Sequence, residues 1–315
     1  MQSFLKGKKV LVTGGAGFIG SHIVDRLVAI GARVVVLDNL FTGKIENIEH
    51  NLDKIKFIQK DLTDDTALEE ALEGIEFVSH QAALRSVPKS VEIPLDYQEV
   101  NATGTLKLLL KAKDKGVKRV VFASSSSVYG ERVDFPEKEK DLPQPLSPYA
   151  ATKLFGESWG YIFSQLYAVE MVSLRYFNVF GPRQSLENQY AVVVPKFINC
   201  LLNGKNPPIY GDGEQERDFT YIDNVVEANL VALEKEGVTG EVFNVADGSP
   251  KSVNYLLNSL KEITAINIDP VYEDLRPGDV RKTYADISKA KKLLGWQPKV
   301  DFYSGLKKTV TWFKK

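Results

Sequence analysis

The chain has 315 residues, and its 40 lysines and arginines nearly balance its 41 aspartates and glutamates, for a net charge of −1. A balanced charge gives no general attraction to nucleic acid or to anionic lipid, so we expect neither as a partner. Apolar residues make up 43% of the chain without a run long enough to cross a membrane, which indicates a folded, cytosolic protein. The single cysteine, Cys200, excludes an internal disulfide, and the three histidines have no metal-binding spacing, so we expect no metal site.

Short β-branched runs alternate with helical patterns along most of the chain. The expected strands cover residues 9–13, 33–37, 56–59, 77–81, 119–123, 171–177 and 241–245, and the clearest amphipathic stretches cover 19–29, 66–72 and 103–115. Strands that are apolar throughout and alternate with helices predict a parallel sheet that is covered on both faces. Right-handed connections make this a doubly wound α/β sheet, which binds ligands at the carboxyl ends of its strands.

The first expected strand ends in a glycine-rich turn, Gly14-Gly15-Ala16-Gly17-Phe18-Ile19-Gly20. Residues without a Cβ atom let backbone N–H groups approach a pyrophosphate, and the N-terminus of the following helix adds positive potential. Glycines alone suit any tight turn. Their place between a first strand and a helix favours a dinucleotide site at Gly14, Gly17, Phe18, Ile19 and Gly20.

Asp38 ends the second expected strand, where an acidic residue commonly binds the adenosine ribose of a dinucleotide. A carboxylate at this place would repel a 2′-phosphate, so we expect NAD rather than NADP. Other expected cofactor ligands follow the second, third and fourth strands: Asn39, Asp61, Leu62, Ala82 and Ala83.

Near residue 181 the sequence changes, and prolines begin to punctuate shorter elements. We therefore expect a dinucleotide-binding domain of the Rossmann type over residues 1–180 and a smaller substrate-binding lobe over residues 181–315. The run at 241–245 looks like a strand that returns to the sheet, so the two parts would interleave.

The spacing Tyr-x-x-x-Lys occurs twice, at Tyr149/Lys153 and at Tyr303/Lys307. Ser147-Pro148 predicts the start of a helix just before Tyr149, which puts that tyrosine and Lys153 on one helix face. This helix follows the strand that leads into the serine run 124–127, at the cofactor side of the sheet. The second pair lies in a lysine-rich terminal helix and is expected to face solvent.

A tyrosine base needs help, because its ordinary pKa is near 10. A nearby ammonium group and an oxidised nicotinamide both favour the phenolate. The pattern therefore predicts that Lys153 lowers the pKa of Tyr149.

Four motifs occur together and in order: the glycine turn, Asn101-x-x-Gly104, the serine run 124–127 and Tyr149-x-x-x-Lys153. From residue 9 to about 296 the chain resembles an extended short-chain dehydrogenase/reductase of the NAD-dependent nucleotide-sugar epimerase and dehydratase group. The resemblance implies that Tyr149 is the base and that Lys153 also binds the nicotinamide ribose. It implies that Ser125 hydrogen-bonds the reacting sugar hydroxyl, with Ser124 and Ser126 left open as alternatives. It also places Asn101 and Tyr176 beside the cofactor.

The dehydratases of this group carry an Asp-Glu pair where this chain has Ser126 and Ser127. Without that pair, and with Asp38 opposing NADPH, the resemblance implies redox-neutral 4-epimerisation. A hydride leaves C4 of the sugar for NAD, the transient 4-keto sugar turns over, and the hydride returns to its other face.

Motifs in the second lobe resemble the UDP-sugar site of the same group. Arginine suits a diphosphate because its planar fork binds phosphate in a bidentate way. The implied substrate ligands are Asn178, Val193, Tyr210, Arg217, Arg276, Asp279 and Thr283, together with Arg85, Ser86, Ser125, Ser126 and Tyr149 of the first domain.

Thr283 aligns with a gating position in the 4-epimerases of the group, where a small residue leaves room for an N-acetyl group. The resemblance therefore favours UDP-N-acetylglucosamine and UDP-N-acetylgalactosamine, with UDP-glucose and UDP-galactose also accepted. Arg85 stands where a small residue is expected, and a guanidinium could bind a carboxylate, so a UDP-glucuronate 4-epimerase stays open. A non-catalytic NAD-binding sensor is the alternative of another class.

The resemblance also implies a homodimer, formed through helices near 96–115 and 149–167.

Overall fold

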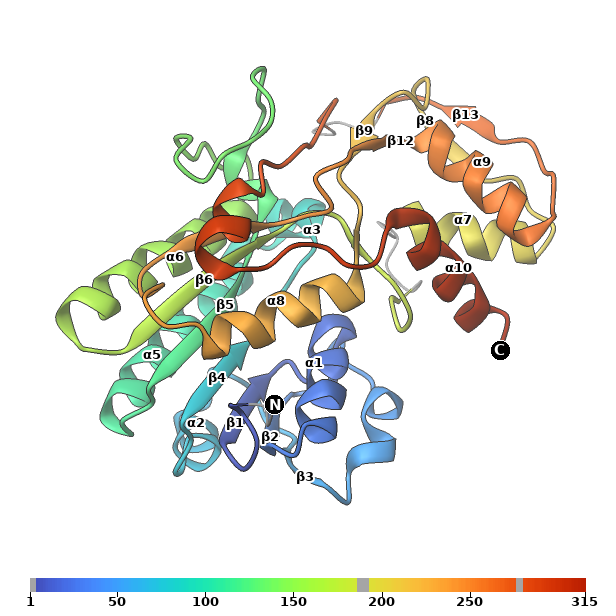
Figure 1. Cartoon of the computed structure of the whole chain (residues 1–315). Coiled ribbons are helices and arrows are strands. Elements are labelled where there is room, and N and C mark those ends of the chain that lie inside the picture. Colours follow the sequence, from blue (N-terminus) through green and yellow to red (C-terminus); the bar gives the residue numbers. More distant parts are fainter. Residues whose placement is uncertain (1–3, 186–192, 276–279) are drawn as a thin grey trace.

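A seven-stranded parallel sheet forms the centre of the computed structural model, which describes residues 4–185, 193–275 and 280–315 (Figure 1). In spatial order its strands are β11 (Val242–Val245), β6 (Glu170–Tyr176), β5 (Arg119–Ser125), β4 (Phe77–His80), β1 (Lys9–Thr13), β2 (Arg33–Leu37) and β3 (Ile55–Ile58). The chain order reverses between β1 and β4, which is where doubly wound sheets bind ligands. The predicted fold class is confirmed.

Strand β5 is longer than the sequence indicated. It continues to Ser125 because Ser124 and Ser125 pair in register with Arg175 and Tyr176 of β6. The serine run therefore begins inside the sheet and turns into a short 3₁₀ helix at Ser126–Tyr129.

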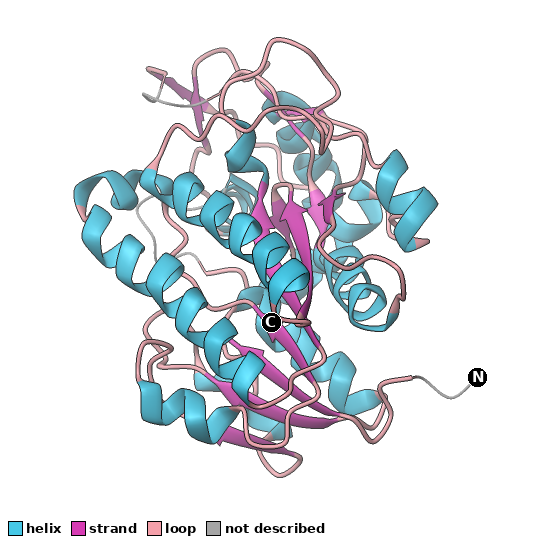
Figure 2. Cartoon of the chain, turned by 90° about the vertical axis from the view of Figure 1, so that its left-hand side faces the viewer, coloured by secondary structure: helices cyan, strands magenta, loops and turns pink. Residues whose placement is uncertain are grey.

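Helices cover both faces of the sheet, as Figures 1 and 2 show. Strand β1 illustrates the division: Val10 and Val12 belong to a core shared with α1 (Phe18–Ala29) and α8 (Ile222–Glu234). Leu11 points to the other face, into a core shared with α2 (Asp65–Ala71), α5 (Gly104–Asp114) and α6 (Pro148–Leu166). Burial on both faces explains why β1 and β2 are apolar in their middle positions, Val10–Val12 and Val34–Val36.

Short elements connect these layers. They comprise α3 (Val87–Glu92), α4 (Pro94–Tyr97), 3₁₀ turns at Ile45–Asn47 and Glu49–Asn51, and π-helical segments at Gln98–Thr103 and Ala290–Leu294.

Outside the layers of the central sheet, the described residues from 179 onward form helices and pairs of very short strands. The helices are α7 (Val193–Leu202), α9 (Val253–Thr264) and α10 (Phe302–Phe313), and the strand pairs are β8 (Pro208–Tyr210) with β13 (Val271–Glu273), β9 (Glu216–Arg217) with β12 (Lys251–Ser252), and β7 (Val179–Phe180) with β10 (Thr220–Tyr221). Both β7 and β11 link this part of the chain to the first, so the two interleave. A division at residue 180 stays a prediction.

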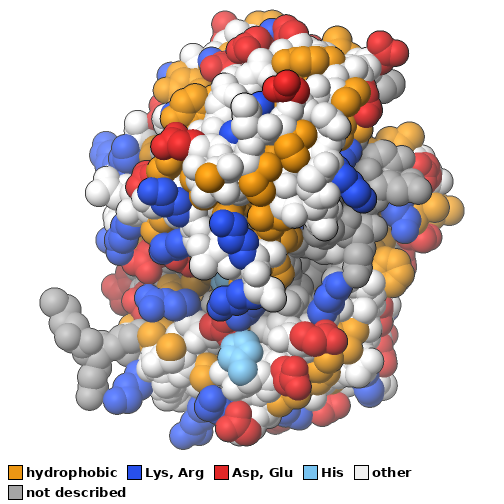
Figure 3. Space-filling view, turned by 90° about the vertical axis from the view of Figure 1, so that its right-hand side faces the viewer, with side chains coloured by type: hydrophobic (Ala, Val, Ile, Leu, Met, Phe, Trp, Pro, Cys, Tyr) orange, Lys and Arg blue, Asp and Glu red, His pale blue; other side chains and the backbone are white. Residues whose placement is uncertain are grey.

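The surface mixes charges of both signs, which agrees with the balanced composition. Figure 3 shows basic and acidic side chains interspersed on the face that carries the C-terminal helix. Among the described residues, no helix is long and apolar enough to span a membrane, and no group of His, Cys, Asp and Glu side chains is arranged to hold a metal ion.

Candidate active site

A cavity of about 670 Å³ lies along the carboxyl ends of the central strands. Its wall extends from Asp38 after β2, past the glycine turn after β1, to Tyr149 and Lys153 on α6. Every residue predicted to bind the cofactor lines this cavity except Asn101. The sequence motifs, which are far apart in the chain, therefore share one site.

The glycine turn leaves no room for side chains at two positions. A Cβ atom on Gly14 would lie 2.7 Å from the Ala82 nitrogen, and one on Gly20 would lie 2.1 Å from the Gly14 oxygen. Gly14 also has a φ of +66°, which favours glycine. Gly17, the N-cap of α1, offers no side-chain cap to the helix N–H groups, so the turn fits an anionic pyrophosphate.

Two carboxylates at the strand ends are fixed by hydrogen bonds. The Ala16 N–H donates to Asp38 Oδ2 at 2.9 Å and the Leu40 N–H donates to Oδ1 at 2.8 Å, while burial raises the pKa of Asp38. Burial works against ionisation of Asp61 as well, but donors on Thr63 and Asn39 outweigh it and lower the pKa of Asp61. Rigid acceptors of this kind fit the hydroxyls of a ribose, so this end of the cavity suits the adenosine half of NAD.

Asn101 lies behind the cavity wall, and its place beside the cofactor stays a prediction. Its side chain is buried, accepts a hydrogen bond from the Leu84 N–H at 2.8 Å and donates to the Leu84 carbonyl at 2.9 Å. It also donates to Thr152 Oγ1 at 3.2 Å. The amide is thus occupied by protein groups and holds the loop after β4 against α6.

Helix α6 presents Tyr149 and Lys153 to the cavity. The helix starts as predicted, with Ser147 accepting a hydrogen bond from the Ala150 N–H and Pro148 in its first turn. Lys153 Nζ lies 5.8 Å from the centre of the Tyr149 ring and donates to the Ala123 carbonyl at 2.8 Å. The Tyr149 side chain is hydrogen-bonded to Ser125.

The electrostatics of this pair differ from the prediction. Burial raises the pKa of Tyr149, and the groups that oppose this rise are Ser125, through its hydrogen bond, and Arg85, through its charge. Burial also lowers the pKa of Lys153 to about 7. Burial thus disfavours the charged form of both members of the pair, the phenolate of Tyr149 and the ammonium of Lys153.

The serine run divides between two tasks. Ser124 donates a hydrogen bond to the Glu157 carboxylate, which forms a buried bidentate ion pair with Arg175 at 2.9 and 2.7 Å. Ser125 instead bonds to Tyr149 and accepts a hydrogen bond from the Ser127 hydroxyl at 2.9 Å. The geometry brings Ser125 to the tyrosine and commits Ser124 to the ion pair, which favours Ser125 among the three alternatives.

The predicted substrate ligands fall into three groups. Arg85 and Tyr149 line the cavity, whereas Ser125 and Ser126 do not. Ser86 caps α3 by accepting a hydrogen bond from the Lys89 N–H at 3.3 Å. The second-lobe residues Asn178, Val193, Tyr210, Arg217 and Thr283 do not line the cavity either. Arg276 and Asp279 lie outside the described residues.

Some second-lobe residues nevertheless contact one another. The Thr283 hydroxyl donates to Asn178 Oδ1 at 3.1 Å and accepts from the Asp218 N–H at 3.2 Å. Arg217 is buried next to Asp218 in β9 and its neighbouring loop, and its guanidinium donates to the Glu216 carbonyl. Tyr210 accepts a hydrogen bond from Lys196 at 3.3 Å. Asn178, Thr283 and Arg217 thus form one connected region.

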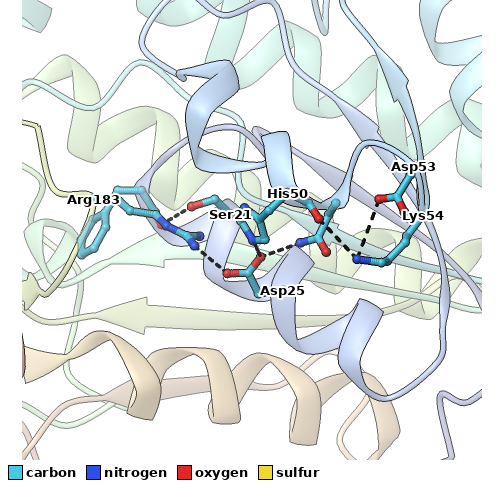
Figure 4. A network of polar contacts seen from close by, with 8 residues as sticks. Ser21, Asp25, His50, Asp53, Lys54 and Arg183 are labelled. Atoms are coloured by element: carbon cyan, nitrogen blue, oxygen red, sulfur yellow. Dashed lines mark hydrogen bonds and ion pairs between the residues drawn. The ribbon is translucent and has the colours of Figure 1, made fainter. Parts of the chain in front are cut away.

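Sequence reasoning missed the segment that follows Gly181-Pro182. Arg183, Gln184 and Ser185 line the cavity, as do Trp312 and Phe313 at the end of α10. Figure 4 shows how Arg183 is held: its Nη2 atom pairs with Asp25 at 2.8 Å. Asp25 also accepts hydrogen bonds from His50 and Asn51. A positive φ of 66° at Arg183 is a tertiary feature for which the sequence carries no signal.

Comparisons with known proteins agree with this site. Residues 10–246 match the model of the NAD dependent epimerase/dehydratase family. The structure of the UDP-glucose 4-epimerase of Thermotoga maritima with UDP-glucose is 44% identical in sequence to this chain and superposes with a TM-score of 0.93. The match covers 97% of this chain and 98% of the Thermotoga maritima chain. The UDP-N-acetylglucosamine 4-epimerase of Methanobrevibacter ruminantium M1, in complex with UDP-N-acetylmuramic acid, is 44% identical over 98% of this chain and 99% of its own, with a TM-score of 0.94. The UDP-glucuronic acid 4-epimerase of Bacillus cereus, in complex with UDP-glucuronic acid and NAD, is 35% identical over 97% and 99%, with a TM-score of 0.90.

Proposed function

The chain belongs to the NAD dependent epimerase/dehydratase family and is a UDP-sugar 4-epimerase, and we propose that it interconverts UDP-N-acetylglucosamine and UDP-N-acetylgalactosamine. UDP-glucose and UDP-galactose are accepted as well. NAD is its cofactor. One observation carries the proposal: Tyr149, which is hydrogen-bonded to Ser125, and Lys153 stand at one end of a cavity whose other end has the rigid carboxylates expected for an adenosine ribose.

Each residue has a role that its position supports. Tyr149 takes the proton of the sugar 4-hydroxyl and gives it back, while Ser125 hydrogen-bonds the same hydroxyl. Lys153 holds the nicotinamide ribose, and the glycine turn with Asp38 holds the other half of the dinucleotide. Bound NAD supplies the acceptor and donor of a hydride at C4.

The preference for N-acetylated sugars depends on Thr283. Its small side chain donates a hydrogen bond to Asn178 Oδ1, and a tyrosine ring at this position would be much larger. Thr283→Tyr should therefore impair turnover of UDP-N-acetylglucosamine selectively and spare UDP-glucose, while Thr283→Ser serves as the matched control. Equal losses on both sugars would remove the argument for a gate at this position.

A second candidate, a UDP-glucuronate 4-epimerase, is favoured by Arg85, which brings a guanidinium to the cavity wall. The deciding experiment incubates the purified protein with a panel of UDP-sugars and follows the C4 stereocentre by NMR. Conversion of UDP-N-acetylglucosamine supports our proposal, and conversion of UDP-glucuronate alone supports the second candidate. If no UDP-sugar is converted, a non-catalytic NAD sensor becomes the better account.

We also propose a homodimer. Three large apolar side chains are exposed on the neighbouring helices α5 and α6: Leu110 at 44%, Phe155 at 38% and Tyr161 at 60%. Such a surface suits a self-complementary contact between two copies of the chain. Light scattering on the purified protein tests this, and a monomer at micromolar concentration would contradict it.

A further inference from the structure

We propose that Asn229 is a positioning residue for the nicotinamide end of the cavity. It closes a ring of hydrogen bonds with Tyr176 and Gln81, which both line the cavity. The ring fixes a part of the wall at the end where the proposed function puts the nicotinamide of NAD. The inference therefore rests on the proposed function, because that function places the nicotinamide beside Tyr149.

In the arrangement that uses all three partners, each side chain of the ring donates once and accepts once. Asn229 Nδ2 donates to the Tyr176 hydroxyl oxygen at 2.8 Å, this hydroxyl donates to Gln81 Oε1 at 3.2 Å, and Gln81 Nε2 donates to Asn229 Oδ1 at 3.0 Å. The same hydroxyl lies 3.1 Å from Asn229 Oδ1, which is its other acceptor. Burial raises the pKa of Tyr176, so the hydroxyl keeps the hydrogen that it donates. Hydrogen bonds linked in this way strengthen one another.

Asn229 can orient its two partners because it is held in place itself. It is fully buried on α8, which packs against β4, β5 and β6. Its second N–H donates to the Val225 carbonyl, one turn back along the helix, at 2.8 Å. Gln81 is tied a second time, because it also donates to the Ser79 hydroxyl of β4 at 3.0 Å. An amide whose N–H groups are all used has a single orientation, and this orientation passes to the groups bonded to it.

The ring lies next to the Tyr149 end of the cavity. Tyr176 is in register with Ser125 of the neighbouring strand β5, and Ser125 is hydrogen-bonded to Tyr149. Gln81 follows β4 on the other side of β5, so its bond to Tyr176 reaches across that strand. Hydride exchange needs the reacting atoms about 3–3.5 Å apart, so a small shift of the wall at this place costs rate.

Asn224 is a matched comparison for Asn229. It lies on the same helix and is also deeply buried, with 2% of its surface exposed against 0% for Asn229. Its amide donates to the Val300 carbonyl at 2.8 Å and accepts from the Lys299 and Val300 N–H groups at 2.9 and 3.0 Å. Neither partner lines the cavity. Leucine at either position removes buried hydrogen bonds and should lower stability, but only the loss at Asn229 should reach the cofactor.

The test measures how well ADP-ribose, which lacks the nicotinamide, displaces NAD from the purified protein with its bound cofactor. A wall that holds the nicotinamide contributes to binding of NAD and not to binding of ADP-ribose. Asn229→Leu should therefore lower the ADP-ribose concentration that displaces half of the NAD by about tenfold, a typical effect of losing a buried hydrogen bond. Tyr176→Phe keeps the aromatic ring, opens the hydrogen-bond ring and should act in the same direction. Asn224→Leu should leave this concentration unchanged.

Turnover gives a second readout. Asn229→Leu should lower kcat by about 10–100-fold with little change in the KM for the UDP-sugar, because the nicotinamide is misplaced and the sugar nucleotide is not. Adding Tyr176→Phe should cost little more, since both changes open the same ring. An unchanged ADP-ribose concentration in both ring variants, or an equal shift in Asn224→Leu, would overturn the proposal. Failure of the wild-type protein to convert any UDP-sugar would instead contradict the proposed function, while the displacement of NAD would still judge Asn229.

Discussion

The chain carries the Tyr-x-x-x-Lys spacing at the start of two helices, α6 and α10, and the two helices begin alike. Ser147 caps α6 by accepting a hydrogen bond from the Ala150 N–H, and Asp301 caps α10 by accepting one from the Ser304 N–H. In both helices the lysine lies near the face of its tyrosine, with Nζ 5.8 Å from the ring centre in α6 and 4.6 Å in α10. Local sequence thus produces the same local geometry twice.

The surroundings of the two pairs differ completely. Tyr149 is half-buried in a cavity wall, where it is hydrogen-bonded to Ser125 and where Arg85 lines the same cavity. Tyr303 is at the surface and donates a hydrogen bond to Glu262 at 2.7 Å, which raises the pKa of Tyr303. A carboxylate beside a phenol opposes phenolate formation, whereas the neighbours of Tyr149 favour it. Spacing therefore specifies a helix face, and tertiary neighbours decide whether that face can perform acid–base chemistry.

The largest expected effect is that of Tyr149→Phe. Removing the hydroxyl removes the proposed base, so kcat should fall by about 10²–10⁴-fold. The ring still packs against Tyr97, so the melting temperature should stay close to that of the wild type. NMR turnover and thermal unfolding measure the two quantities. A variant that keeps more than about a tenth of the wild-type kcat would contradict the comparison.

The second effect is the pH dependence of the free energy of unfolding, which should involve Lys153 but not Lys307. Lys153 has a pKa of about 7 in the folded protein, below the ordinary value of about 10.4 in the unfolded chain. Between these values the unfolded chain binds more protons, so stability should rise with pH from 7 to 10. The gain is lost again as pH falls from 10 to 7, and below 7 this contribution no longer changes with pH. The rise amounts to at most about 4 kcal/mol.

Lys153→Met should remove this rise, and Lys307→Met is the matched control that should keep it. Urea unfolding at several pH values measures the difference between each variant and the wild type. If both variants show the same pH dependence, the burial of Lys153 does not disfavour its charged form, and the contrast between the two helices is wrong.

A smaller effect separates the two serines that precede α6. Ser125→Ala removes a hydrogen bond to the proposed phenolate and should lower kcat by about 10–100-fold, the equivalent of about 1.5–3 kcal/mol. Ser124→Ala leaves the Glu157–Arg175 pair with one donor fewer and should lower stability by about 1–3 kcal/mol with little change in kcat. The reverse pattern would move the catalytic role from Ser125 to Ser124.

Sequence reasoning reached most of the sheet and the cofactor end of the cavity because backbone geometry constrains them. A Cβ atom at Gly14 or Gly20 would collide with the backbone, so only glycine fits there. Asp38 directly follows the last residue of β2, so the end of the expected strand already locates it. Such constraints are local and leave a mark on residue type and spacing. The apolar runs of β1 and β2 also predicted strands at the right residues, because these strands are buried on both faces.

The remaining site residues depend on the direction in which their side chains point, and the spacing of residues in the sequence does not determine that direction. Asn101 keeps the family spacing yet faces the loop behind the wall, and Ser124 differs from Ser125 only through the buried Glu157–Arg175 pair. Arg183 reaches the cavity through a left-handed backbone conformation next to Gly181-Pro182. The burial of Lys153, which lowers its pKa, was missed for the same reason, because burial depth is a property of the whole fold.

The smallest expected effect is that of Tyr303→Phe, which is the counterpart of the first variant. The lost hydroxyl is exposed, and its bond to Glu262 joins two surface side chains, so stability should change by less than about 0.5 kcal/mol and kcat should not change. The same turnover and unfolding assays apply. A clear loss of kcat would mean that the spacing itself, rather than the cavity around it, marks a functional tyrosine. A silent variant beside an inactive Tyr149→Phe would assign the whole difference to burial and neighbours, because the two helices share their caps, their spacing and the approach of lysine to the ring.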